Sequence, residues 1–458
     1  MKYKDLEYLS APLPEDILKE KWSGNFDRAR KIIDRRLSTD KLPYSLRCRL
    51  LLELNNMEVL EECYTLTKAE ALCQVQEKIP EFTEAEFDDL QVEGKIDWIY
   101  LHGEIRYLNT FCATLFKVYP ELWERTVSGD ESDYGILEDL VENLEDGDTL
   151  ACHIHIKQKL NIHPDVFVEP CHLRVHLPLP QETEFVQNLR ILEIKPKPVK
   201  LPEGHELQPS IYFEADSSDL EYTVEYEFDH VRTYIDVSKV DENAIANGEI
   251  PNDVQQYLCE ELPHIQFTPY LKALAAELRG NETNPIFIAR KIYDYITTQT
   301  DYRFVREYAS IDNIAEYCAV NRKGDCGVQA LLFITLCRIS GIPAKWESGL
   351  DAKPSDVGEH DWAMFYIPTL GWLYADLSYG GSSYIRGAMK RWNYFFGNVD
   401  PYRIPINDAF QSSLTPEKQY WRIDPYDNQC GEVECDNYGL KGTDITYQYE
   451  DIDIHRIR

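Results

Sequence analysis

The spacing of apolar residues along the chain changes twice, and each change indicates a different kind of secondary structure. From about residue 14 to residue 145, apolar residues recur every three to four positions, which is typical of amphipathic helices. The clearest segments are NFDRARKIIDRRL, SLRCRLLLELNNMEVL and KIDWIYLHGEIRYLNTFCATLFKVYPELW. We therefore predict an N-terminal helical domain over residues 1–145.

The period then shortens to two, which is typical of strands with one buried face. In LEYTVEYEF, for example, Tyr222, Val224 and Tyr226 alternate with acidic or hydroxyl side chains. Further strand-like runs, interrupted by proline and glycine, are HLRVHLPLPQ, RILEIKP and SIYFEA. This pattern predicts an antiparallel β-sandwich over residues 146–250.

Helices return in a third segment, residues 251–400, which we expect to be a separate domain. TNPIFIARKIYDYITTQT predicts a helix capped by Thr283, with Pro285 in its first turn. A second helix, in RKGDCGVQALLFITLCRISGIPAKW, should begin at Cys326 and end at Ser340. The tyrosine-rich residues 401–458 are expected to be an extension that packs on this domain.

The composition of the chain limits where the protein can be located in a cell and which partners it can bind. The formal net charge of −33 opposes nucleic acid and anionic membranes as partners. Neither a signal peptide nor a membrane-spanning run is visible, so we predict a cytoplasmic protein. The twelve cysteines are scattered in apolar contexts and are interpreted as reduced thiols, so a single reactive cysteine is plausible. We expect no metal and no cofactor, because glycine-rich phosphate loops and calcium loops are missing from the sequence.

Cys326 is the candidate nucleophile, because a thiol at a helix start lies among unpaired backbone amides that favour the thiolate. That effect is worth only about 0.3–1 kcal/mol, so a neighbouring base is needed. His360 lies on a predicted strand, and a turn leads to the next strand, which ends at Asp376. A hairpin would bring these two side chains together, and the acid would orient the imidazole.

These residues occur in motifs that resemble the transglutaminase-like superfamily. The motifs are Arg322-Lys323-Gly324-Asp325-Cys326, Ala330, Cys337-Arg338, Gly341-Ile342-Pro343-Ala344-Lys345, His360-x-Trp362, Gly371-Trp372 and Asp376-x-Ser378. The resemblance covers residues of about 280–400 and implies a papain-like, α+β catalytic domain. It also implies that Cys326 is the nucleophile, His360 the base and acid, and Asp376 the orienting partner. The preceding sandwich resembles domains that accompany bacterial members.

Four further residues are candidates for the substrate-binding site. We expect Trp362 and Trp372 to keep the site dry, and Asp361, where the superfamily usually has a small residue, to change the charge of its mouth. Tyr302 either lines the site, with a hydroxyl available to an oxyanion, or packs in the core.

The resulting hypothesis is a cysteine peptidase or amidase that acts on a peptide or isopeptide amide. Two alternatives stay open: an acyltransferase that cross-links protein glutamines, and a catalytically idle scaffold that retains the fold. The expected partner is a peptide or protein substrate, and the helical domain could recruit a further protein. The sequence leaves the substrate and the oligomeric state undetermined.

Overall fold

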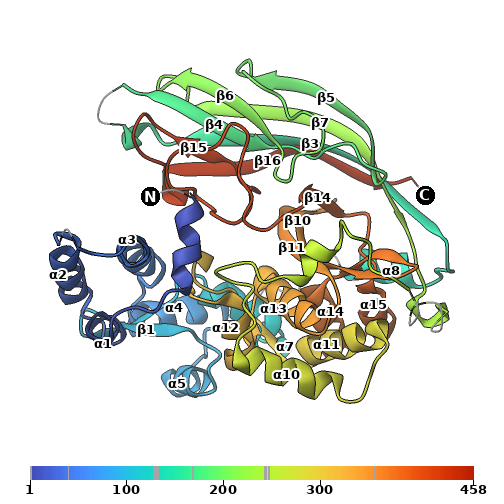
Figure 1. Cartoon of the computed structure of the whole chain (residues 1–458), viewed down its shortest axis with the longest axis horizontal. Coiled ribbons are helices and arrows are strands. Elements are labelled where there is room, and N and C mark those ends of the chain that lie inside the picture. The colour runs from blue at the N-terminus through green and yellow to red at the C-terminus, as the bar shows by residue number, and fades with distance from the viewer. Residues whose placement is uncertain are drawn as a thin grey trace.

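The chain folds into a strand-rich layer and a helix-rich layer, with the N-terminal helices at one end of the latter (Figure 1). This mixture of helices and strands agrees with the α+β expectation. In the computed structural model, the described residues are 3–39, 41–126, 134–167, 170–241, 245, 248–354 and 356–457.

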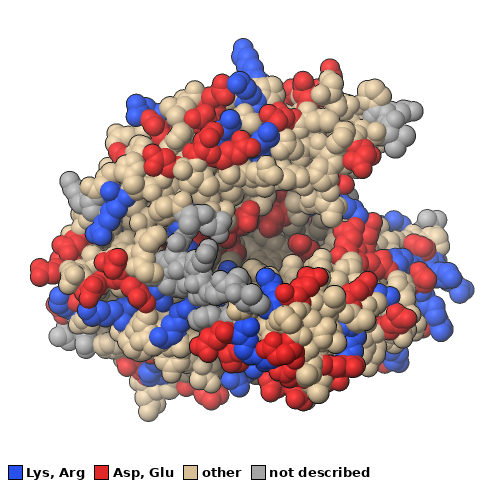
Figure 2. Space-filling view, turned by 180° about the vertical axis from the view of Figure 1, so that it is seen from behind, with Lys and Arg blue, Asp and Glu red and all other residues tan. Residues whose placement is uncertain are grey.

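On the face shown in Figure 2, acidic side chains are spread out rather than gathered into one patch. The face shown there is hollowed near its centre, and acidic and basic side chains both lie at the rim of the hollow. Within the described ranges, every helix is too short or too polar to cross a bilayer.

The first 141 residues are mainly helical. The elements are η1 (Tyr3–Ser10), α1 (Glu15–Trp22), α2 (Phe26–Leu37), α3 (Tyr44–Cys63), α4 (Lys68–Lys78), α5 (Glu84–Val92), β1 (Trp98–Leu101), β2 (Glu104–Tyr107), α6 (Phe111–Val118), α7 (Pro120–Trp123) and α8 (Tyr134–Val141). The helical pattern expected over residues 95–123 is wrong in its first part, because a β-hairpin of β1 and β2 occupies residues 98–107. Its turn is formed by His102 and Gly103, whose φ angles of 52° and 83° are incompatible with a right-handed helix.

Two antiparallel sheets follow. Their strands are β3 (Thr149–Ile162), β4 (His172–Pro178), β5 (Val186–Lys195), β6 (Ser210–Asp216) and β7 (Glu221–Thr233), joined by β15 (Glu432–Glu434) and β16 (Ile445–Arg456). The sheet orders are β16-β3-β7-β5 and β15-β4-β6. Phe213 of β6 and Tyr222 of β7 meet edge to face with ring centroids 5.2 Å apart, so the two sheets share one core.

The C-terminal extension packs on more of the molecule than the third part of the chain, where we expected it to lie. β14 (Arg403–Asn407) does join the sheet of that third part, beside β10. β15 and β16, however, pair with β4 and β3, more than 250 residues earlier in the chain. The end of the chain therefore completes both strand-rich sheets, where the red strand runs along the green ones in Figure 1.

The third part of the chain contains a five-stranded antiparallel sheet of order β13-β12-β11-β10-β14. Its strands are β10 (Ala344–Lys353), β11 (Asp356–Ile367), β12 (Gly371–Ala375), β13 (Phe396–Gly397) and β14; a short parallel pair is formed by β8 (Asp301–Tyr302) and β9 (Lys323–Gly324). The helices are α10 (Pro269–Arg279), α11 (Pro285–Gln299), η5 (Tyr308–Ser310), α12 (Ile314–Asn321), α13 (Cys326–Ile339), α14 (Leu377–Ile385) and α15 (Met389–Tyr394). The cap of α11 is Asn284, one residue after the expected Thr283.

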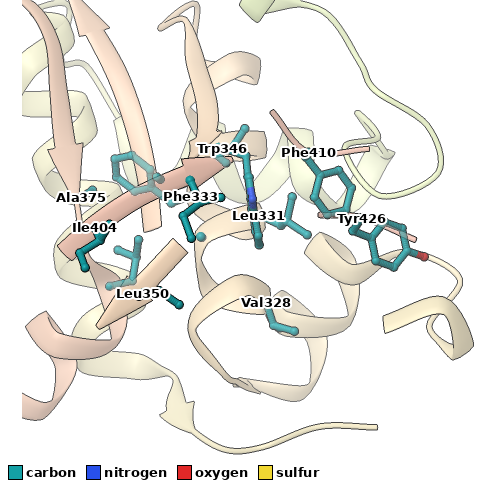
Figure 3. Packing of buried hydrophobic residues seen from close by; sticks show 14 of the residues in the cluster. Val328, Leu331, Phe333, Trp346, Leu350, Ala375, Ile404, Phe410 and Tyr426 are labelled. Atoms are coloured by element: carbon teal, nitrogen blue, oxygen red, sulfur yellow. The ribbon is translucent and has the colours of Figure 1, made fainter. Parts of the chain in front are cut away.

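α13 is the buried centre of this part. Leu331 and Phe333 lie in a cluster that Trp346 and Leu350 of β10 close from the sheet side, and Val328 is buried at the start of the helix (Figure 3). Truncating a buried leucine in such a core typically costs about 2–5 kcal/mol, so the position of the helix start is strongly determined.

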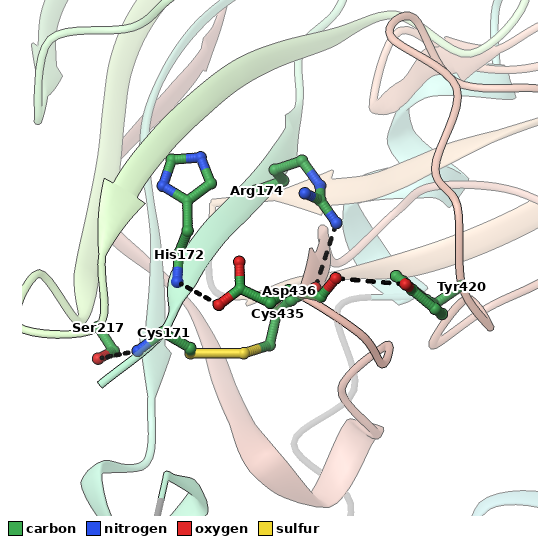
Figure 4. Close-up of a disulfide and its surroundings, with 7 residues drawn as sticks. All are labelled: Cys171, His172, Arg174, Ser217, Tyr420, Cys435 and Asp436. Carbon is green, nitrogen blue, oxygen red and sulfur yellow. Dashed lines mark hydrogen bonds between the residues drawn. A yellow bond between two sulfur atoms is a disulfide. The ribbon is translucent and has the colours of Figure 1, made fainter. Parts of the chain in front are cut away.

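Two cysteines that the sequence interpretation treated as reduced thiols form a disulfide. Cys171 precedes β4 and Cys435 follows β15, and their sulfur atoms are bonded (Figure 4). The antiparallel pairing of β4 with β15 brings the two strand ends together, which spacing along the sequence cannot show. The other ten cysteines are free.

Candidate active site

Cys326 is the first residue of α13, at the point where the chain leaves the short β8–β9 pair. Asp325 caps the helix by accepting a hydrogen bond from the backbone N–H of Val328 at 3.2 Å. Gly324 is needed because a side chain there would meet the Val328 side chain at 2.2 Å. The close packing of strand against helix start thus places the Cys326 thiol at the edge of a cavity.

His360 and Asp376 come from neighbouring strands of the same hairpin. β11 pairs with β12 so that Ala363 lies opposite Ala375, which puts Asp376 diagonally across from His360. The Nε2 atom of His360 lies 2.8 Å from Oδ2 of Asp376. This bond leaves Nδ1 as the ring nitrogen available to the thiol.

Asp376 is fully buried and has enough donors to stay ionised. Its Oδ2 also accepts a hydrogen bond from Arg403 Nε at 3.2 Å, and its Oδ1 accepts one from the backbone N–H of Tyr379 at 3.0 Å. Burial raises the pKa of Asp376, but His360, Arg403 and the Tyr379 amide outweigh this effect and hold the pKa below its ordinary value. The carboxylate can therefore stabilise an imidazolium.

Cys326 and His360 open onto one cavity of about 400 Å³. Its wall includes Tyr302 and Tyr379, together with Lys117 of α6 from the N-terminal helices. The Nζ atom of Lys117 lies 5.2 Å from the centre of the Tyr302 ring. The N-terminal part of the chain therefore forms one side of the candidate site.

The environment of the thiol differs from the expectation of a depressed pKa. Burial raises the pKa of Cys326 well above its ordinary value, and the Asp361 and Asp325 carboxyl groups act in the same direction. The hydrogen bond from the Asp361 backbone and the charge of Lys117 oppose this shift without overcoming it. A thiol with a raised pKa needs a neighbouring base to become a nucleophile, and His360 lines the same cavity.

The other sequence candidates occupy different places. Trp362 is fully buried beside His360, with ring centroids 5.9 Å apart, so it excludes water from that side without lining the cavity. Trp372 packs against Tyr257 and Lys345, away from the cavity. Asp361 lies behind the thiol rather than at the mouth, with Oδ2 at 3.4 Å from the Cys326 sulfur.

Several residues of the site were missed by the sequence interpretation. Asp351 accepts hydrogen bonds from Arg403 at 2.6 Å and Lys353 at 2.8 Å, and this network supports the Asp376 carboxylate from below. Gln429 of the C-terminal extension donates to the backbone oxygen of His360 at 3.1 Å and to Asp361 at 3.2 Å. In the sequence, the only sign of the network of Asp351, Lys353 and Arg403 was that charged residues occur within apolar strands. No feature of the sequence pointed to Gln429.

Part of the chain is similar to known proteins. The pattern of the transglutaminase-like superfamily matches residues 272–377, which include both Cys326 and Asp376. Comparison with curated proteins found no match. Among solved structures, a proposed cysteine protease from Cytophaga hutchinsonii is similar, with 15% identity, a TM-score of 0.44, and coverage of 68% of this chain and 92% of that one. The periplasmic domain of TgpA from Pseudomonas aeruginosa is similar over 57% of this chain and 95% of that one, with 15% identity and a TM-score of 0.29.

Proposed function

We propose that this protein, whose residues 272–377 match the transglutaminase-like superfamily, is a cysteine-dependent acyl-transfer enzyme that hydrolyses a peptide or isopeptide amide. The observation that carries the proposal is the shared cavity of Cys326 and His360, with His360 Nε2 held 2.8 Å from Asp376. Cys326 acts as nucleophile, His360 as base and acid, and Asp376 as the orienting carboxylate.

The reaction proceeds in two halves. The Cys326 thiol passes its proton to Nδ1 of His360 while the sulfur forms a bond to the amide carbon. The imidazolium then gives this proton to the leaving nitrogen, the carbon–nitrogen bond breaks, and a thioester remains. Water, deprotonated by His360, attacks the thioester and releases the acid and the free thiol.

The cavity favours an extended peptide segment as substrate. Aromatic rings of Tyr302, Phe304 and Tyr379 line it, and they offer apolar contact area to a polypeptide. Lys117 and the neighbouring Val118 extend this wall from α6, so the N-terminal helices are proposed to contact the substrate and thereby to select it. The net charge of −33 supports a protein rather than a nucleic acid or an anionic membrane as partner.

A peptide-library assay of wild type against Cys326→Ala tests the proposal. Wild type should cleave a subset of peptides and the variant none, whereas Cys73→Ala, which removes an exposed thiol of α4, should behave as wild type. If wild type incorporates an amine without cleaving the peptide, the reaction is cross-linking rather than hydrolysis. Equal cleavage by wild type and Cys326→Ala would refute the enzymatic assignment. The scaffold that retains the fold would then be the remaining hypothesis.

The cytoplasmic location is part of the proposal, and the Cys171–Cys435 disulfide is the observation against it. Alkylation of acid-quenched cells before lysis would decide this point. A cytoplasmic protein should carry both sulfurs alkylated, whereas recovery of the intact disulfide would place the protein in an oxidising compartment.

A further inference from the structure

Asp361 is held against the sulfur of the proposed nucleophile. Its Oδ2 lies 3.4 Å from Cys326 Sγ, and its Oδ1 accepts a hydrogen bond from Gln429 at 3.2 Å. The space for this contact exists because residue 327 is glycine: a Cβ atom there would lie 2.6 Å from Asp361 Oδ2. The side chain is only 8% exposed, so solvent does not compete for the contact.

The surroundings of Asp361 are acidic. Burial raises the pKa of Asp361 well above its ordinary value, and Asp427, Asp325 and Asp424 act in the same direction. In the described part of the chain, the structure shows no ion pair between Asp361 and a basic side chain. The titratable groups that face it or its immediate partners are His360 on β11, Cys326 and Asp325 at the start of α13, Tyr302 of β8, Tyr308 of η5, and Asp424 and Asp427 in the loop before β15, with Lys117 and Arg422 as the nearest cations acting on them.

A thiolate and an ionised Asp361 are therefore hard to accommodate together. Two like charges at this separation repel each other, and the burial of Asp361 reduces screening by solvent. A neutral carboxyl group in the same position can instead donate an O–H to the thiolate, and hydrogen bonds to an ionised partner are the strong ones.

We propose that Asp361 is a further catalytic residue, a protonated carboxyl group that donates a hydrogen bond to the Cys326 thiolate, so that the nucleophile forms only while Asp361 keeps its proton. This inference rests on the proposed function. In the active state the thiol proton moves to Nδ1 of His360 and Asp361 retains its own proton. When Asp361 loses its proton to solvent at higher pH, the thiol donates to the carboxylate and stays un-ionised.

The test is the rate of iodoacetamide labelling of Cys326 in the full-length chain from pH 5 to pH 10, measured by mass spectrometry of the digested protein. For wild type, the rate constant should rise, pass a maximum and fall as Asp361 ionises. Asp361→Asn keeps the size and can donate from its amide, so its rate should not fall and should exceed that of wild type at least tenfold at pH 9. Asp427→Asn should move the fall to lower pH, because it removes a neighbouring acid that favours protonated Asp361. Cys73, an exposed thiol in the same digest, should show an ordinary monotonic rise in every protein.

The outcomes separate this inference from the proposed function. A monotonic rise of Cys326 labelling in wild type overturns the role of Asp361, even if Asp361→Asn does not fold. An Asp361→Asn profile with the wild-type maximum overturns it as well. Equal peptide cleavage by wild type and Cys326→Ala removes the proposed function and, with it, this inference.

Discussion

Replacing Asp376 by asparagine tests the role of the buried carboxylate most directly. The substitution keeps the shape of the side chain and removes its charge beside His360, where Oδ2 lies 2.8 Å from Nε2. The hairpin register and the cap of α14 should persist, because an asparagine oxygen can still accept the hydrogen bond from the Tyr379 amide. The expected loss is therefore one of charge stabilisation rather than of fold.

The size of the loss follows from the geometry. Opposite unit charges about 4 Å apart interact by about 4 kcal/mol at an effective dielectric constant of about 20. Each 1.4 kcal/mol, roughly, corresponds to a factor of ten in rate, so the full interaction is worth about three powers of ten. Arg403 donates to the same oxygen at 3.2 Å and neutralises part of that charge. We expect kcat/KM to fall by about a hundredfold to a thousandfold.

The assay is the cleavage rate of the best library peptide at pH 7, with the unfolding temperature measured alongside. Asp400→Asn is the matched control, because Asp400 is equally buried and also pairs with Arg403, at 3.5 Å, but does not contact His360. Its kcat/KM should stay within about threefold of wild type. A loss of less than tenfold in Asp376→Asn, or equal losses in both variants, would refute the assignment of Asp376 as the partner of His360.

Three other predictions concern stability. Burial, followed by the charge of Asp424, raises the pKa of Asp427 to about 8, so the folded state keeps a proton that the unfolded state releases above pH 4, roughly. The urea midpoint should therefore fall as the pH rises from 5 to 8, and Asp427→Asn should make this fall smaller. A wild-type midpoint that rises over this range would contradict the reasoning. Gly327→Ala should lower the free energy of unfolding, measured by thermal or urea unfolding, by about 1–3 kcal/mol, because the added Cβ would meet Tyr308, Asp361 and Trp346 within 2.8 Å. Gly358→Ala is the control and should leave the free energy of unfolding nearly unchanged, because the space around Gly358 is open. Cys171→Ser should lower the urea midpoint under oxidising conditions by the equivalent of about 2–4 kcal/mol, and reductant should bring wild type to the same value; an unchanged midpoint would mean that the disulfide does not form.

Local patterns predicted the elements that carry the proposed triad. The glycine, aspartate and cysteine before an apolar run predicted the start of α13 at Cys326, and the structure begins that helix there. The two strands around His360 and Asp376 were likewise predicted, because a short turn between apolar runs allows few other arrangements. The helical pattern expected over residues 95–123 was wrong in its first part because β1 and β2 are only four residues each, too short for periodicity to distinguish a strand from a helix.

By itself, the sequence determined the helix and strand periods, the order of Cys326, His360 and Asp376 along the chain, and the resemblance to the transglutaminase-like superfamily that the match over residues 272–377 supports, because these properties depend on residues that lie close together in the sequence. Only the tertiary structure decided that β16 pairs with β3, that Lys117 forms a wall of the cavity, and that Asp361 lies behind the thiol instead of at the mouth. Each of these depends on packing between segments far apart in the chain. Such contacts are selected by shape, burial and charge in three dimensions, and no short stretch of sequence contains that information.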